Sequence, residues 1–338
     1  MSGGEARLDR GWRKLEAGDH AGAQRLVEAE LRADPENPDG LVLLGACRRA
    51  QGDLEGALAA FAHAAQAAPE WSEPAFCMAE IYAQEMDSPA QALPHAAAAL
   101  ERAEEEDEFL EAIVLKADLE IQLGRIKAAQ ATLAELPAAE EVSLPAERAL
   151  DLAYLFLEAD LAQEAESRLR LLLERDAEDA EAWYALGLCA EQRGDEAGKR
   201  AAWLRVLELD RQAPLESPHL SEGEMAEVAE QALRELPERA RRLITNVPIL
   251  VVDSPAADEV EHGLDPRLLG LFEGTAYGDD SSVGGAPQVT RILLFRKNLE
   301  RMALDADDLR EQIRITLLHE TGHFFGMSEA DLTDVGLD

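Results

Sequence analysis

Two histidines and a glutamate near the end of the sequence have the types and spacing of a metal site with its own base. His319 and His323 stand four positions apart, and Glu320 directly follows the first histidine. On a helix both imidazoles lie on one face, one turn apart, where they can bind the same Zn²⁺ at about 2.0–2.1 Å. Glu320 then lies beside the metal, where it can take a proton from water and pass it to a leaving amine. The three residues predict hydrolysis at a zinc ion, with Glu320 as the general base.

The elements around these residues are those that could position them. A long helix is expected over residues 305–325, and it carries both histidines in its last turns. An earlier helix is expected over 225–236 and a short final helix from Ser328. A segment rich in β-branched residues predicts a strand at 247–253. Two further strands are expected at 268–277 and 291–295, with a loop at 279–287 between them. Strands between helices indicate a small α+β domain, which we expect to span residues 219–338.

The residues beyond the second histidine extend the pattern. Gly326 follows His323 by three positions and Glu329 by six, which gives His-Glu-x-x-His-x-x-Gly-x-x-Glu. This run resembles the zincin metallopeptidases, most closely the small bacterial zincin-like domains, over about residues 222–338. The resemblance implies a zinc peptidase in which the two histidines and Glu329 are the metal ligands. Asp331, two residues further on, is the alternative third ligand. A second interpretation makes the histidines ordinary helix residues with local hydrogen bonds.

The first two thirds of the sequence repeat with a period of 34 residues. Gly18-Asp19 recurs as Gly52-Asp53, 34 positions later, and Gly194-Asp195 occupies the same place in a further unit. Gly-Asp pairs end one helix and begin a turn before the next. Degenerate versions of the pair lie at Met86-Asp87, Gly124-Arg125 and Ala159-Asp160. The pattern predicts helical pairs joined by tight turns.

Each well-matched unit places a small residue in its first helix and an aromatic residue in its second. Gly45 and Phe61 hold these places in one unit, and Gly187 and Trp203 in another. The arrangement resembles the tetratricopeptide repeat, with about six repeats over residues 5–212. One pair cannot bury its own apolar face, so successive pairs stack into a solenoid. The resemblance implies a groove that holds a protein or peptide partner; the alternatives are a spacer or a self-association surface.

Composition limits the partners. The 69 acidic and 32 basic residues give a net charge of -37, which repels nucleic acid and anionic membranes and favours basic partners. No stretch approaches the roughly 18 apolar residues of a membrane span, and the first residues lack an apolar signal core. We expect a cytoplasmic protein that binds neither nucleic acid nor membranes. The sparse cysteines Cys47, Cys77 and Cys189 are expected to be small buried side chains inside the repeats.

These features predict a mainly α protein, in which an α-solenoid of tetratricopeptide repeats is followed by a small α+β zincin-like domain. Residues 214–223, which are rich in Pro, Ser and Gly, are expected to link the two. The leading hypothesis is a zinc-dependent peptidase whose repeats select or deliver a protein substrate. The alternative is an adaptor, in which the repeats bind a partner and the zinc-binding domain is weakly active or inactive.

Overall fold

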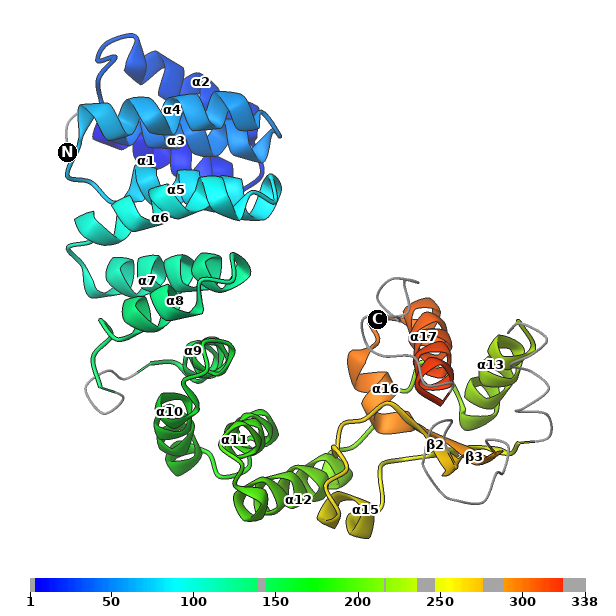
Figure 1. Cartoon of the computed structure of the whole chain (residues 1–338). Helices are drawn as coiled ribbons and strands as arrows, with labels where there is room; N and C mark the ends of the chain where they lie inside the picture. Colours follow the sequence, from blue (N-terminus) through cyan, green and yellow to red (C-terminus); the bar gives the residue numbers. More distant parts are fainter. Residues whose placement is uncertain (1–3, 139–143, 216, 236–246, 276–287, 325–338) are drawn as a thin grey trace. The chain divides into compact units, whose positions relative to one another are not determined.

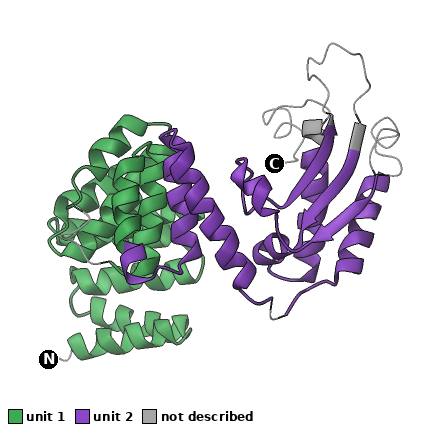
Figure 2. Ribbon diagram, turned by 90° about the horizontal axis from the view of Figure 1, so that it is seen from below, with its two compact units in different colours: residues 1–171 green, residues 172–338 purple. Residues whose placement is uncertain are grey.

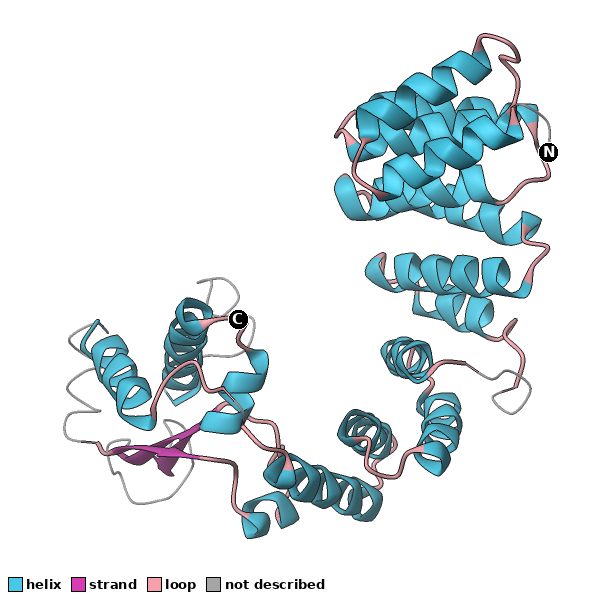
Figure 3. Ribbon diagram, turned by 180° about the vertical axis from the view of Figure 1, so that it is seen from behind, coloured by secondary structure: helices cyan, strands magenta, loops and turns pink. Residues whose placement is uncertain are grey.

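The computed structural model describes residues 4–138, 144–215, 217–235, 247–275 and 288–324 (Figure 1). The chain divides into two compact units, residues 1–171 and 172–338 (Figure 2). The described part of the first unit is helical, whereas the second combines helices with a three-stranded sheet (Figure 3). The expected final helix from Ser328 and the expected loop at 279–287 lie outside the described residues.

Helices α1 to α12 follow one another as six pairs, which matches the repeat number expected from the sequence. The third pair continues its first helix as one π-helical turn, η1 (Ile81–Glu85). The helices are α1 (Glu5–Glu16), α2 (His20–Leu31), α3 (Pro38–Ala50), α4 (Leu54–Ala67), α5 (Glu73–Glu80), α6 (Pro89–Arg102), α7 (Glu106–Gln122), α8 (Ile126–Leu133), α9 (Ala146–Glu158), α10 (Ala162–Arg175), α11 (Ala180–Gln192) and α12 (Glu196–Gln212).

The turn inside each pair contains one residue with left-handed backbone. Gly52 has φ 80°, and no atom lies within 4 Å of the position of a Cβ, so backbone strain alone disfavours other residues there. The next residue, Asp53, accepts the backbone N–H of Gly56 at 3.0 Å and caps α4. In the third and fifth pairs Asp87 (φ 45°) and Asp160 (φ 58°) take the left-handed position. Those two repeats look degenerate because aspartate replaces the glycine. Glycine keeps the position in the remaining pairs, at Gly18, Gly124 and Gly194.

The two helices of a pair approach closely where a glycine faces an aromatic ring. A Cβ on Gly45 would stand 2.6 Å from the ring of Phe61, and a Cβ on Gly187 would overlap the ring of Trp203. Both aromatic side chains are buried. The small and aromatic positions read from the sequence therefore mark the contact between helices, where packing leaves no room for another carbon.

The second unit continues beyond α12 with a sheet and further helices. Strand β3 lies in the middle of the sheet, parallel to β1 and antiparallel to β2. All three expected strands are present, but the two short helices α15 and α16 were not expected. The elements are α13 (Glu222–Glu235), β1 (Ile249–Val252), α15 (Ala257–Glu261), β2 (Gly270–Thr275), β3 (Gln288–Phe295), α16 (Arg296–Met302) and α17 (Ala306–Phe324).

Helices α13 and α17 cover one face of the sheet and share a core with it (Figure 1). Alternation along β3 turns Ile292 and Leu294 toward the two helices. Both side chains are fully buried. The helices contribute Met225, Ala229 and Ala232 from α13 and Leu309, Ile313 and Leu317 from α17. This core fixes how α17 lies on the sheet.

The last helical pair belongs to the same compact unit as the sheet. Asp210 of α12 is buried, and its two carboxylate oxygens lie 3.3 Å from Nε of Arg267 and 2.6 Å from Nη2 of Arg301. The Tyr184 hydroxyl donates to Asp265 at 2.8 Å. Val260 of α15 packs in one cluster with α12 and is fully buried. Charge and apolar contacts both join the last repeat to the domain that follows it.

The segment expected as a linker also makes contacts. The Lys297 ammonium of α16 donates to the backbone oxygens of Asp210, Arg211 and Ala213 at 2.7–3.1 Å, which are the free carbonyls at the end of α12. The carboxylate of Glu300 accepts the backbone N–H of His219 at 3.0 Å. The compact units thus divide near residue 171 and not at 212–219, and the division of the sequence at 5–212 and 219–338 stays a prediction. No helix within the described ranges has the length and apolar character that crossing a membrane requires.

Candidate metal centre

Helix α17 begins at a reciprocal cap. The Asp305 carboxylate accepts the backbone N–H groups of Asp307 and Asp308, each at 2.9 Å, and the Asp308 carboxylate accepts the N–H of Leu304 at 2.8 Å. These backbone hydrogen bonds, first that from Asp308, lower the pKa of Asp305 below its usual value. The helix therefore begins one residue after Asp305, as its acidic first turn predicts.

A buried stripe along α17 sets its rotation. Leu309, Ile313 and Leu317 recur at helical spacing, and each is almost completely buried in the core shared with the sheet. Thr316 and Thr321, beside this stripe, are also buried, and Thr321 Oγ1 donates to the Leu317 carbonyl at 2.5 Å. The stripe leaves little freedom for the helix to turn about its axis.

His319 and Glu320 lie in the last turns of α17, and both are half-buried. They stand three and four positions after Thr316, so all three share one face of the helix. His323 lies in the same helix, four positions after His319, as the motif requires. Its side chain lies outside the described part of the structure. So do Gly326, Glu329 and Asp331, and the choice of third ligand stays a prediction.

Strand β2 packs against the helix face that carries these residues. A Cβ on Gly270 would stand 2.9 Å from Cγ2 of Thr316 and 3.1 Å from the carbonyl oxygen of Leu293. Gly270 belongs to β2 and is small because α17 passes over it. The register shift in β2 lies between Glu273 and Gly274. Glycine at position 270 lets the strand closely approach the face of α17 that carries Thr316.

The residues present fit a zinc ion by their chemistry. Imidazole nitrogens and a carboxylate are the ligands that zinc prefers. One turn before His319, the hydroxyl of Thr316 is buried, and its Oγ1 forms no hydrogen bond with a described group. A buried polar atom of this kind can accept a water molecule or ligand as its partner. Among the described residues no three His, Cys, Asp or Glu side chains cluster to hold a metal. Of the four predicted site residues, only the side chains of His319 and Glu320 fall in that set.

Sequence reasoning did not include Thr316 and Gly270 among the site residues. Thr316 carries a readable signal, because it lies one helical turn before the histidine and glutamate and hence on their face. Gly270 carries none, since its close approach to α17 depends on contacts between segments distant in the sequence. Only the packed structure reveals it.

The three cysteines lie in helices of the repeats. Cys47 and Cys189 are fully buried, as expected, and burial raises the pKa of each thiol to about 11. Cys77 is half-buried, and burial raises its pKa as well, with the Glu73 carboxylate as the next cause. Thiols that stay protonated are poor metal ligands and poor nucleophiles, which supports the expectation that these cysteines are packing residues.

Comparison with known families matches both parts of the chain. A model described as a zincin-like metallopeptidase matches residues 244–337. A tetratricopeptide repeat model matches residues 8–70 and 150–214. The chain thus combines tetratricopeptide repeats with a zincin-like metallopeptidase domain, and the first match contains every predicted site residue.

Three solved structures illustrate what the chain is similar to, each over most of that structure's own length. PilW, a type IV pilus biogenesis factor, is 15% identical, with 63% of this chain and 96% of that chain covered at a TM-score of 0.45. YrrB, a tetratricopeptide repeat protein with an unusual peptide-binding site, is 15% identical. The match covers 55% of this chain and 93% of that chain at a TM-score of 0.45. A tetratricopeptide repeat protein from Parabacteroides merdae is 19% identical. The match covers 72% of this chain and 97% of that chain at a TM-score of 0.44. No curated protein matches the chain.

Proposed function

We propose that this chain, which joins tetratricopeptide repeats to a zincin-like metallopeptidase domain, is a zinc-dependent peptidase whose repeats hold its protein substrate. The observation that carries the proposal is the helix α17. It presents His319 and Glu320, half-buried and on the face of Thr316, inside the region that the metallopeptidase family matches. The carboxylate of Glu320 is the group that an active site requires as its base and an inactive site does not.

Zinc would be held by His319, His323 and Glu329, with Asp331 as the alternative third ligand. When bound, it would polarise the substrate carbonyl and make water more acidic at neutral pH. Glu320 would accept the proton of the attacking water and donate it to the departing amine. The packed helix supports this role, because a general base must be held within hydrogen-bond distance of the proton that it takes.

Strand β2 is the element best placed to hold the substrate chain beside the metal. Among the described strands it lies at one edge of the sheet, in the order β1-β3-β2, and Gly270 brings it against the face of α17 that carries Thr316. An edge strand offers backbone N–H and C=O groups to an extended peptide, and such pairing does not depend on the peptide's sequence. On this proposal the catalytic domain itself selects little, and selection falls to the repeats.

The test compares metal content and cleavage in matched variants. Purified protein offered zinc should hold about one ion per chain, and His319→Ala or His323→Ala should lose it. Glu320→Gln should keep the zinc and lose digestion of a peptide library by several orders of magnitude, because the base and the metal act as a unit. Glu311→Gln is the control: Glu311 is exposed on the same helix and pairs with Arg314. Its cleavage should equal that of the unaltered protein.

A zinc titration of two further variants identifies the third ligand. Glu329→Ala should weaken zinc affinity more than Asp331→Ala does, and the reverse ranking moves the ligand to Asp331. Protein that binds zinc but cleaves no peptide would support the adaptor hypothesis instead. Protein that binds no zinc would remove the metal centre altogether.

A further inference from the structure

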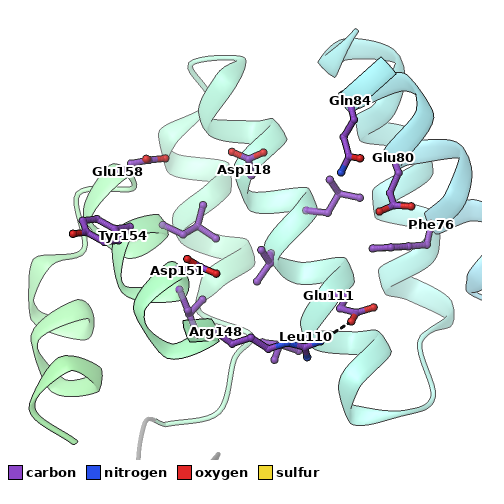
Figure 4. Close-up of a pocket in the computed structure, with 14 residues that line it drawn as sticks. Phe76, Glu80, Gln84, Leu110, Glu111, Asp118, Arg148, Asp151, Tyr154 and Glu158 are labelled. Atoms are coloured by element: carbon purple, nitrogen blue, oxygen red, sulfur yellow. Dashed lines mark hydrogen bonds and ion pairs between the residues drawn. The ribbon is translucent and has the colours of Figure 1, made fainter. Parts of the chain in front are cut away.

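The first unit contains a groove lined by three helices, each the first of its pair. Residues of α5, α7 and α9, with Gln84 of η1, enclose a cavity of about 480 Å³, which we call the α5–α7–α9 groove (Figure 4). Its floor is apolar and includes Phe76, Val114 and Leu152. Its rim carries five carboxylates, and the arginine Arg148 is the one basic residue among its lining side chains. A cavity of this size accommodates a few side chains of a bound peptide.

Two of the five carboxylates already have cationic partners. Glu111 lies 3.1 Å from Nη2 of Arg148, and the Arg148 side chain is also 3.7 Å from Asp107. Glu80 lies 2.7 Å from Nη1 of Arg49. The charge of Arg148 is therefore taken up by its own neighbours and does not offset the rest of the groove.

The other three carboxylates have no cation within ion-pair distance among the described residues. They are Asp118 of α7 and Asp151 and Glu158 of α9. Asp118 accepts the side-chain amide of Gln122 at 2.8 Å, but burial still raises the pKa of its carboxyl. Figure 4 shows Asp118 and Glu158 together toward one end of the groove and the Arg148–Glu111 pair toward the other. The groove thus has an apolar floor and one acidic end.

We propose that the α5–α7–α9 groove binds a peptide segment in which a Leu-sized or aromatic side chain stands next to Lys or Arg. The apolar side chain would enter the floor against Phe76 and Val114, and the cation would meet Asp118, Asp151 and Glu158. This proposal rests on the proposed function in one respect: the bound segment would be the part of the peptidase's substrate that the repeats hold. An acidic segment is disfavoured, because its carboxylates would be repelled by those at the acidic end of the groove.

The experiment measures binding to the full chain by fluorescence anisotropy. The probe is a short labelled peptide made of Lys, Leu and Phe; one comparison peptide has Glu for every Lys, and another has Ser for every Leu and Phe. The triple variant Asp118→Asn, Asp151→Asn, Glu158→Gln should bind the first peptide about tenfold more weakly, since the peptide's cation then loses its carboxylate partners, of which Asp118 is partly buried. The two comparison peptides should bind the unaltered protein weakly.

A second triple variant is the matched control. Asp9→Asn, Glu55→Gln and Glu101→Gln remove the same charge from exposed sites in the same unit, outside the groove. It should change binding by less than about twofold, because none of these three residues lines the groove in which the peptide would bind. Equal weakening by both triple variants, or no preference for the basic apolar peptide, would overturn the proposal. Both triple variants should keep their zinc and cleave a generic short peptide unchanged. Failure of the groove proposal therefore appears in peptide binding alone, whereas failure of the proposed function appears in zinc content and cleavage.

Discussion

At the scale of single residues, the candidate site depends on a face of α17 that the core fixes in place. The buried stripe of Leu309, Ile313 and Leu317 sets the rotation of the helix, and the motif then places His319 and Glu320 on the adjoining face. Gly270 supports the arrangement from outside the motif, because it lets β2 lie against Thr316. The function assigned to the histidines and the glutamate therefore depends on a residue with no chemistry of its own.

We expect Gly270→Ala to damage both stability and cleavage. The added carbon would stand 2.9 Å from Thr316 and 3.1 Å from a backbone oxygen, so strand and helix must separate. Overpacking of this kind costs about 1–3 kcal/mol. Denaturant titration should show the loss, and cleavage should fall because α17 shifts on β2.

Gly223→Ala is the control. The new carbon, at the start of α13, meets no atom within 4 Å, so the stability of this variant should be equal to that of the unaltered protein or higher. Equal stability of the two variants would show that the β2–α17 contact is loose.

At the scale of elements, the repeats follow from one local rule, which is a left-handed residue between the helices of each pair. Gly52 and its counterparts satisfy it without strain, and Asp87 and Asp160 satisfy it at a cost. The rule explains why the third and fifth repeats match the Gly-Asp pattern poorly, although their helix pairs still form.

Exchanging residues at this position should change stability in opposite directions. Gly52→Ala should lower the free energy of unfolding by about 1–2 kcal/mol, although its surroundings are empty, because an L-residue is strained there. Asp87→Gly should raise it by up to about 1 kcal/mol for the converse reason. Chemical denaturation of the full chain followed by circular dichroism measures both. A loss of stability in Asp87→Gly would mean that the aspartate side chain contributes more than its backbone strain costs.

The elements that the sequence predicted are those specified by nearby residues. Gly-Asp turns, the acidic first turn of α17 and the β-branched segments depend on neighbours in the chain, and each was placed within a few residues. The short helices α15 and α16 were missed, since neither is long enough to show a periodic apolar pattern. The closeness of Gly270 to Thr316 was also missed, because it joins positions 46 residues apart in the sequence. Of the candidate site, the sequence predicts the ligands and the base, which stay predictions, but it did not indicate the strand β2 that packs against Thr316.

At the scale of the whole molecule, the second unit combines the last repeat with the candidate catalytic domain. Burial alone would lower the pKa of Arg267, but hydrogen bonds and charge from Glu181 and Asp210 outweigh it and leave the pKa raised. The guanidinium thus stays charged between the last helical pair and the sheet. Although both parts of the chain are acidic, particular ion pairs hold this repeat to the domain after it.

A fragment of residues 172–338 should therefore be more stable than one of residues 219–338. The shorter fragment exposes Val260, whose burial contributes about 1.5 kcal/mol or more, and removes both carboxylates that pair with Arg267. Thermal unfolding of the two fragments, each loaded with zinc, measures the difference. Asp210→Asn within the longer fragment should lower its melting temperature and so remove part of the difference between the two fragments. Equal melting temperatures would support the sequence boundary at 219 and make the contacts of α12 incidental.

The ammonium of Lys297 also has a consequence for how the protein could have grown. Repeat arrays lengthen by duplication wherever one helical pair can follow another. A pair inserted directly after α12 would separate the carbonyls at its end from Lys297 and break the hydrogen bonds between them. Pairs inserted upstream, among the repeats that precede α11, would leave those bonds in place. The number of repeats can then change from one descendant to another while the join between α12 and the candidate catalytic domain is inherited intact.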